Sequence, residues 1–352
     1  MERPYRLVTR LDPSQDRPAP HPSPPPVPCR RFIARGTTSD RTVLLTAPLP
    51  GADPVLFRAE AEAAQRLAPP WTFPVTETDG AAHGADAWFT TPYVPALPLP
   101  VALAVHGGPL PEETVRVIGA ALAETLTALH AQGVAHAGVA PASVLLTADG
   151  PRLTCFGAAR ATDRVDRAAQ APEQATGGLP RPPGDVYGLG AVLAYAATGH
   201  TVPERSELPS ALGATITACL TRDPAHRPSA AALLPALSPP TPHGTVLGSA
   251  TTLLTPDWLP PRVVAALAHQ SAALLAADLA VTAETAETAE APGPGGGSAT
   301  GNDHGHGSGT GHGHDGLGQG RGHDGQGRGH DGQGRGHDRL GQAHGHGIGI
   351  GN

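Results

Sequence analysis

The run DVYGLGAVLAYAATG at residues 185–199 is apolar on almost every side. A helix of this kind must be buried, because a surface helix keeps a polar face toward water. Residues 111–133 predict a second strong helix, with acidic residues in its first turn and Gly133 as its stop. Two further helices are predicted at 208–224 and 229–237. The chain from residue 111 to residue 237 is therefore expected to be rich in α-helix.

The first hundred residues differ, because short strand-like runs there surround a single helix. Asp53 is a candidate N-cap of that helix, and Leu56, Ala59, Ala63 and Leu67 are expected on one of its faces. The predicted order is three strands, one helix and two strands, at residues 5–11, 29–36, 41–49, 53–68, 71–80 and 86–94.

Glycine and proline together make up close to a quarter of the chain, which predicts long unfolded or loop-rich stretches. Residues 18–28 form a proline-rich segment, and 238–291 are expected to hold a linker and an amphipathic helix near 259–280. From residue 292 the chain is mostly Gly, His, Asp, Gln and Arg, with a seven-residue repeat RGHDGQG. Residues 292–352 are therefore predicted to be a disordered Gly/His-rich tail.

Bulk composition bears on partners and compartment. The net charge of −7 argues against nucleic acid as the main partner. The most apolar long stretch, 263–281, is interrupted by polar residues, so no membrane span is expected. Cys29, Cys155 and Cys219 are far apart in the sequence, without the spacing of a disulfide framework or a zinc ribbon. With no signal-peptide pattern at the start, a cytoplasmic protein is predicted.

Four motifs follow one another between residues 128 and 230. They are ALHAQGVAHAGVAPASVLLTADGPRLTCFGAAR at 128–160, APEQ at 171–174, GDVYGLGAVLAYAATGHTVPE at 184–204 and RDPAHRPSA at 222–230. Together they resemble bacterial Ser/Thr protein kinases of the eukaryotic type. The resemblance implies an α+β, bilobal protein-kinase-like fold, with a small β-rich N-lobe at 1–95 and a larger α-helical C-lobe at 96–237.

Aligned with that family, the chain lacks the residues that carry the reaction. Gly138 stands at the catalytic Asp, Ser143 at the metal-binding Asn and Cys155 at the metal-holding Asp of the D-F-G motif. Thr46 aligns with the strand lysine and Ala140 with the loop lysine, and all 24 Lys+Arg residues of the chain are arginine. A proline-rich segment replaces the phosphate-covering glycine loop, and proline has no N–H to offer a phosphate.

Positions that hold the family's structure are kept. The resemblance implies an ion pair between Glu173 and Arg227, and a cap on the catalytic-loop backbone from Asp185. His136 and Phe156 match packing positions around that loop, and Gly157 keeps the last position of the D-F-G motif. Loss of reactive groups with retention of structural ones is what a pseudokinase looks like.

Some positions remain candidates for binding a nucleotide. Glu60 stands where the lysine's helical partner would be, and it is expected either to pair with an arginine or to be solvated. Tyr93 and Val94 align with the hinge between the lobes, where backbone groups would meet adenine. Cys155 is expected to be a small buried side chain, with a redox or metal site as the alternative. No cofactor is predicted, and binding of ATP with Mg²⁺ is the disfavoured alternative.

The tail offers H-x-H pairs that suit Zn²⁺, Ni²⁺ or Cu²⁺. They are formed by His304, His306, His312, His314, His344 and His346. The favoured interpretation is a soluble tail that binds Ni²⁺ or Zn²⁺ adventitiously. An arginine–glycine role with RNA is disfavoured, because Arg and Asp nearly balance there and aromatics are absent.

The sequence thus predicts a catalytically inactive pseudokinase that acts as a scaffold or regulator of another protein, such as a kinase or its substrate. The alternative is an active or weakly active ATP-dependent Ser/Thr protein kinase.

Overall fold

The computed structural model describes residues 4–12, 25–39, 41–79, 87–238 and 249–290, with the side chains of the last segment described to residue 277. The chain divides into two units, Met1–Ala291 and Pro292–Asn352. The second unit lies outside the described residues. The predictions of a disordered tail and of its histidine metal ligands, and most of the proline-rich segment, therefore fall outside the described part of the chain.

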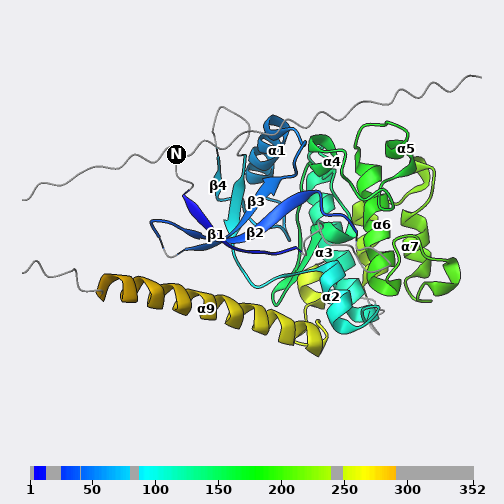
Figure 1. Ribbon diagram of the computed structural model, residues 1–352. Helices are drawn as coiled ribbons and strands as arrows, with labels where there is room; N and C mark the ends of the chain where they lie inside the picture. Colours follow the sequence, from blue (N-terminus) through cyan, green and yellow to red (C-terminus); the bar gives the residue numbers. More distant parts are fainter. Residues whose placement is uncertain (1–3, 13–24, 40, 80–86, 239–248, 291–352) are drawn as a thin grey trace, which may run out of the picture. The chain divides into compact units, whose positions relative to one another are not determined.

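The N-terminal part is an antiparallel five-stranded sheet with one helix, as the sequence predicts (Figure 1). The sheet order is β1-β2-β3-β5-β4. Its strands are β1 (Tyr5–Arg10), β2 (Cys29–Gly36), β3 (Thr42–Pro48), β4 (Glu77–Thr78) and β5 (Phe89–Pro92). In the register of β2 and β3, Arg31 lies opposite Thr46. This pairing places a cation beside the position that aligns with the family's strand lysine.

Helix α1 (Pro54–Leu67) begins at Asp53, whose side chain accepts hydrogen bonds from the Val55 and Leu56 N–H groups. On the face that the apolar spacing marks, Leu56 and Ala59 are exposed. The helix instead buries Ala61 and stacks Phe57 on Phe89, with ring centroids 5.5 Å apart. In a helix this rich in alanine the apolar spacing favours no single face, so the packing partners decide which one is buried.

The rest of the first unit is mainly helical and adds a second, three-stranded sheet of order β6-β7-β8. The small strands are β6 (Leu97–Pro98), β7 (Val144–Thr147) and β8 (Gly150–Leu153). The helices are α2 (Leu99–His106), α3 (Glu112–His130), α4 (Ala158–Ala161), α5 (Pro172–Ala175), α6 (Pro182–Thr198), α7 (Gly213–Cys219), α8 (Ala230–Leu237) and α9 (Pro261–Glu290).

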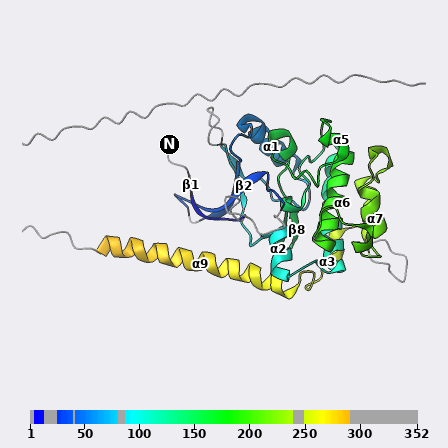
Figure 2. The same cartoon turned by 45° about the vertical axis from the view of Figure 1, so that its right-hand side comes forward.

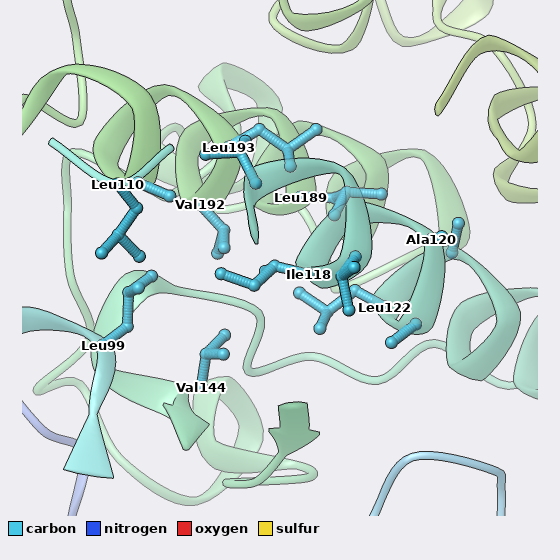
Figure 3. Close-up of a cluster of buried hydrophobic side chains, with 14 of the residues drawn as sticks. Leu99, Leu110, Ile118, Ala120, Leu122, Val144, Leu189, Val192 and Leu193 are labelled. Atoms are coloured by element: carbon cyan, nitrogen blue, oxygen red, sulfur yellow. The ribbon is translucent and has the colours of Figure 1, made fainter. Parts of the chain in front are cut away.

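The apolar run at residues 185–199 forms most of α6, and it is buried as predicted. Figure 3 shows Leu189, Val192 and Leu193 of α6 facing Ile118 and Leu122 of α3. Each aliphatic side chain buried in this way contributes about 1.5–3 kcal/mol relative to an exposed one. This core is the rigid support on which the loop at 136–143 rests.

Helix α9 is longer than the amphipathic helix expected near 259–280. It starts beside α2 and runs past the edge of the five-stranded sheet in both Figure 1 and Figure 2. Val263 and Leu267 are buried in the helical core, whereas Leu275 is exposed. None of the helices in the described residues is long and apolar enough to cross a membrane.

Candidate functional site

Asp185 of α6 holds the loop that begins at His136. Its carboxylate accepts hydrogen bonds from the His136 N–H at 2.7 Å and the Ala137 N–H at 2.9 Å. His130 at the end of α3 contacts the same carboxylate through Nε2, at 2.9 Å. Asp185 is buried, and Ala137 has a left-handed backbone with φ 56. This cap therefore stabilises a loop conformation that a non-glycine residue rarely adopts.

Glu173 and Arg227 form a bidentate ion pair, with two N–H···O hydrogen bonds of 2.7 Å. Arg227 also donates to the carbonyls of Thr221, Pro183 and Arg222. The hydrogen bonds from Arg227 lower the pKa of Glu173. The pair ties the A-P-E-like segment to the base of the helical part, where the resemblance implies it.

His136 is buried, and its ring lies edge-on to Phe156 with centroids 5.4 Å apart. Neither ring nitrogen has a hydrogen-bond partner among the described residues. Burial lowers the pKa of His136 to about 4, because the charged imidazolium would lose its hydration. The ring is therefore neutral at pH 7 and acts as a packing group.

This neutral histidine predicts a loss of stability in acid. Between pH 6.5 and about 4 the unfolded chain binds a proton at His136 and the folded chain does not, so the free energy of unfolding falls as pH falls. The full difference is roughly 3 kcal/mol. Urea unfolding of wild type and His136→Phe across this range should show a flatter profile for the variant. Parallel profiles would contradict a buried neutral His136.

Gly138, at the catalytic-base position, has no room for a side chain. A Cβ built there would lie 2.0 Å from the carbonyl oxygen of Cys155. Real Cβ atoms essentially never come within 3.0 Å of another heavy atom. The backbone of the D-F-G-like segment thus closes the position from which a catalytic carboxylate would project.

Cys155 is buried and has a left-handed backbone, with φ 63. Its Sγ atom lies 3.3 Å from the Sγ atom of Cys29 on β2. The sequence gave no sign of this contact, since the two positions are 126 residues apart. Ser143, at the metal-binding Asn position, is fully buried nearby in the turn before β7.

The guanidinium group of Arg31 on β2 lies beside the loops that hold Ser143 and Cys155. The sequence interpretation did not identify this residue. Its side chain is buried and bonds to both carboxylate oxygens of Asp12, with an Nε–Oδ2 distance of 2.9 Å. It also donates to Thr154 Oγ1 at 3.1 Å and to the Ala142 carbonyl at 3.0 Å. Strand alternation gave a usable signal, because Arg31 shares a face with buried Cys29 and Ile33.

Glu60 of α1 pairs with Arg160 of α4, with N–H···O distances of 2.5 Å and 2.6 Å. Arg160 also lies over the Phe156 ring, 5.4 Å from its centroid. A Cβ added to Gly157 would fall 2.3 Å from the Glu60 side chain, so glycine is required where this carboxylate passes. The acid that would pair with a strand lysine in the family is thus engaged by an arginine from the helical part.

Helix α9 covers the segment that follows the predicted hinge. The Gln270 amide accepts from the Ala96 N–H at 2.8 Å and donates to the Ala96 carbonyl at 3.0 Å. The Tyr93 hydroxyl donates to the same Gln270 oxygen at 3.1 Å. Val94 is half-buried next to it. Leu274 packs on an apolar cluster between the sheet and the helical part, formed by Leu11, Ile33, Leu44, Ala96 and Leu145.

Small cavities lie beside Gly138 and beside the Cys29–Cys155 contact. One has a volume of about 60 Å³ and is lined by Cys29, Arg31, Thr46 and Cys155 among others. The other, of about 40 Å³, lies beside Gly138 and is lined by Asp166, a buried carboxylate with one unpartnered oxygen in the described structure. Burial raises the pKa of Asp166. Spaces of this size hold a few water molecules.

Among the described residues, the positions that align with the family's metal ligands carry no carboxylate for Mg²⁺. The aligned positions offer the thiol of Cys155 and the hydroxyl of Ser143. Among the described residues, no group of three or more His, Cys, Asp or Glu side chains is placed to hold a metal ion. The residues present therefore do not fit the magnesium of a phosphoryl-transfer site.

No protein-family model matches the chain. It is similar to the probable serine/threonine-protein kinase PkwA of Thermomonospora curvata, at 34% identity over 236 residues, which are 59% of this chain and 30% of PkwA. It is also similar to the serine/threonine-protein kinase AfsK of Streptomyces coelicolor, at 32% identity over 270 residues, covering 66% of this chain and 32% of AfsK. The chain thus spans about a third of the length of these relatives.

A third relative is the serine/threonine-protein kinase PknK of Mycobacterium tuberculosis, at 33% identity over 186 residues, which are 44% of this chain and 17% of PknK. Among solved structures, a mutant form of the PknI kinase domain of Mycobacterium tuberculosis matches with a TM-score of 0.49 and 20% identity, covering 64% of this chain and 91% of that chain. These curated relatives are named as serine/threonine-protein kinases, the class of protein that the four motifs resemble.

Proposed function

Since the chain belongs to the bacterial Ser/Thr protein kinase family of the eukaryotic type, we propose that it is a catalytically inactive member that acts by binding another protein, as a scaffold or regulator. The carrying observation is Gly138. The catalytic-base position lacks a carboxylate, and the Cys155 carbonyl occupies the space that its side chain would need. Loss of a general base alone lowers a rate by about 10²- to 10⁴-fold.

Polar groups near the positions where a nucleotide would bind in the family are already engaged in contacts within the chain. Arg31 is held by Asp12, Glu60 is held by Arg160, and the Ala96 backbone is paired with Gln270. A nucleotide would have to displace these contacts, which adds their free energy to the cost of binding. Because the chain has no lysine and the aligned positions lack fitting magnesium ligands, few favourable contacts with a nucleotide would offset that cost.

The second candidate function is an active or weakly active ATP-dependent Ser/Thr protein kinase. Asp166 is the observation that favours it, because this carboxylate lines the cavity beside Gly138. A carboxylate there has a raised pKa and one unpartnered oxygen in the described structure, as a substitute base would. If this function operates, Asp166→Asn should abolish it.

A thermal-shift titration separates the two functions. At 10 mM ATP with Mg²⁺ or Mn²⁺, a Kd of 0.1 mM would stabilise the protein by about 2.7 kcal/mol, which corresponds to a Tm increase of about 5–10 °C. We expect no shift for the wild type. The same titration of Gln270→Ala, which frees the Ala96 backbone, tests whether the contact with α9 alone prevents the binding of ATP.

A Tm increase with ATP, together with phosphate transfer to protein that Asp166→Asn removes, would overturn the inactive assignment. Binding without transfer would keep the protein inactive as a kinase and would make the nucleotide a structural ligand.

A further inference from the structure

The chain has three cysteines, and two of them meet in the structure. Cys29 begins β2 in the sheet, whereas Cys155 follows β8 in the helical part. Their Sγ atoms are 3.3 Å apart, and both residues are free thiols. A disulfide needs about 2.05 Å, so a closure of little more than 1 Å would join them.

The surroundings favour a reactive thiol at Cys155. Its Sγ atom lies 3.3 Å from the Cys29 Sγ atom and 3.5 Å from Thr154 Oγ1. The hydrogen bond from Cys29, assisted by the charge of Arg31, lowers the pKa of Cys155, while the same contact raises the pKa of Cys29. Of the pair, Cys155 is therefore the thiolate and Cys29 the proton donor.

Small oxidants have room beside the pair. Both cysteines line the cavity of about 60 Å³, together with Arg31 and Thr46. A cavity of this volume holds a few water molecules and therefore also a molecule the size of hydrogen peroxide. Cys219, by contrast, is fully buried in the helical core, and burial raises its pKa to about 12. It serves as an internal reference thiol.

We propose that Cys29 and Cys155 are an oxidation site at which a hydroperoxide forms an intramolecular disulfide across the cleft. The Cys155 thiolate attacks one peroxide oxygen, the O–O bond breaks, and Cys155 becomes a sulfenic acid. With hydrogen peroxide, the second oxygen leaves as hydroxide, which becomes water by taking up a proton from the solvent, equivalent to the one that the Cys155 thiol lost on ionising. The Cys29 sulfur then attacks the Cys155 sulfur, and the sulfenic hydroxyl leaves as water with the Cys29 proton. Two thiols are oxidised, and one peroxide is reduced to two waters.

The bond would link β2 to the loop after β8 and so join the two parts of the fold. It closes a loop of 126 residues, and the stabilisation from restricting the unfolded chain grows with loop length. A rise of several degrees in Tm is therefore expected on oxidation. This inference is independent of the proposed function, because it needs no nucleotide and no partner.

The test uses the full chain, treated with a few equivalents of hydrogen peroxide at pH 7 and then alkylated under denaturing conditions. We expect a mass loss of 2 Da, one alkylated thiol in place of three, and a cross-link between tryptic peptides 11–30 and 153–160. Cys219→Ala should keep the cross-link, and Cys29→Ala should lose it. In 6 M urea the selectivity for this pair should disappear.

Three alkylated thiols with no mass loss after peroxide would overturn the proposal, as would a cross-link through Cys219 or between two chains. The wild-type peptide map decides the matter even if Cys29→Ala fails to fold. A dithiol reductant should restore three thiols and the original Tm.

Discussion

Replacing Asp185 with alanine should lower the free energy of unfolding by about 3–5 kcal/mol, a large part of the stability of a domain. The carboxylate is buried and accepts from the N–H groups of His136 and Ala137, with His130 as a third contact. Without it, two buried N–H groups lose their acceptor. The loop then also loses what stabilises the left-handed backbone of Ala137.

Urea unfolding measures this loss directly, and Asp163→Ala is the matched control. Asp163, which follows α4, is an exposed carboxylate, so its removal should change stability by no more than about 0.5 kcal/mol. Equal effects of the two substitutions would show that the Asp185 cap does not hold the loop.

Gly138→Ala should destabilise the protein by about 3 kcal/mol or more, although it adds a single methyl group. The new Cβ would lie 2.0 Å from the Cys155 carbonyl oxygen, and the second atom met, at 3.1 Å, is the carbon of the same carbonyl. Backbone on both sides must move to relieve the clash, and Asp185 opposes that movement on the Ala137 side.

Gly213→Ala is the control, because a Cβ there meets its nearest neighbour at an ordinary 3.5 Å. It should be neutral or slightly stabilising, as glycine is a poor residue in a helix. Gly138→Asp, which restores the family's base, should be at least as unstable as Gly138→Ala and should gain no kinase activity. Wild-type stability for Gly138→Ala would mean that the base position is open.

Several features could be read from the sequence because they depend on local pattern. The all-round apolar character of 185–199 predicted a buried helix, and α6 is one. The strand and helix order of the first hundred residues was also confirmed. Motif spacing aligned Gly138 and Cys155 with reactive residues of the family, and that alignment stays a prediction.

Local pattern did not reveal the contacts between distant segments. Apolar spacing did not identify the buried face of α1, and it left open whether Glu60 is paired or solvated. In the structure Glu60 pairs with Arg160, which lies 100 residues further along the chain. The Gln270 amide on Ala96 spans 174 residues, and no periodicity within α9 distinguishes that glutamine from a solvated one.

The sequence by itself determined the elements of this protein and the residue types at the positions that align with the family's reactive groups, because helix and strand patterns and residue identities are local properties. Only the tertiary structure decided what these residues and their neighbours contact. Arg31 is buried against Asp12, the Cys155 carbonyl closes the space at Gly138, and two cysteines 126 residues apart come into contact. Each of these is a contact between different segments of the chain, and it depends on tertiary packing that no local pattern encodes.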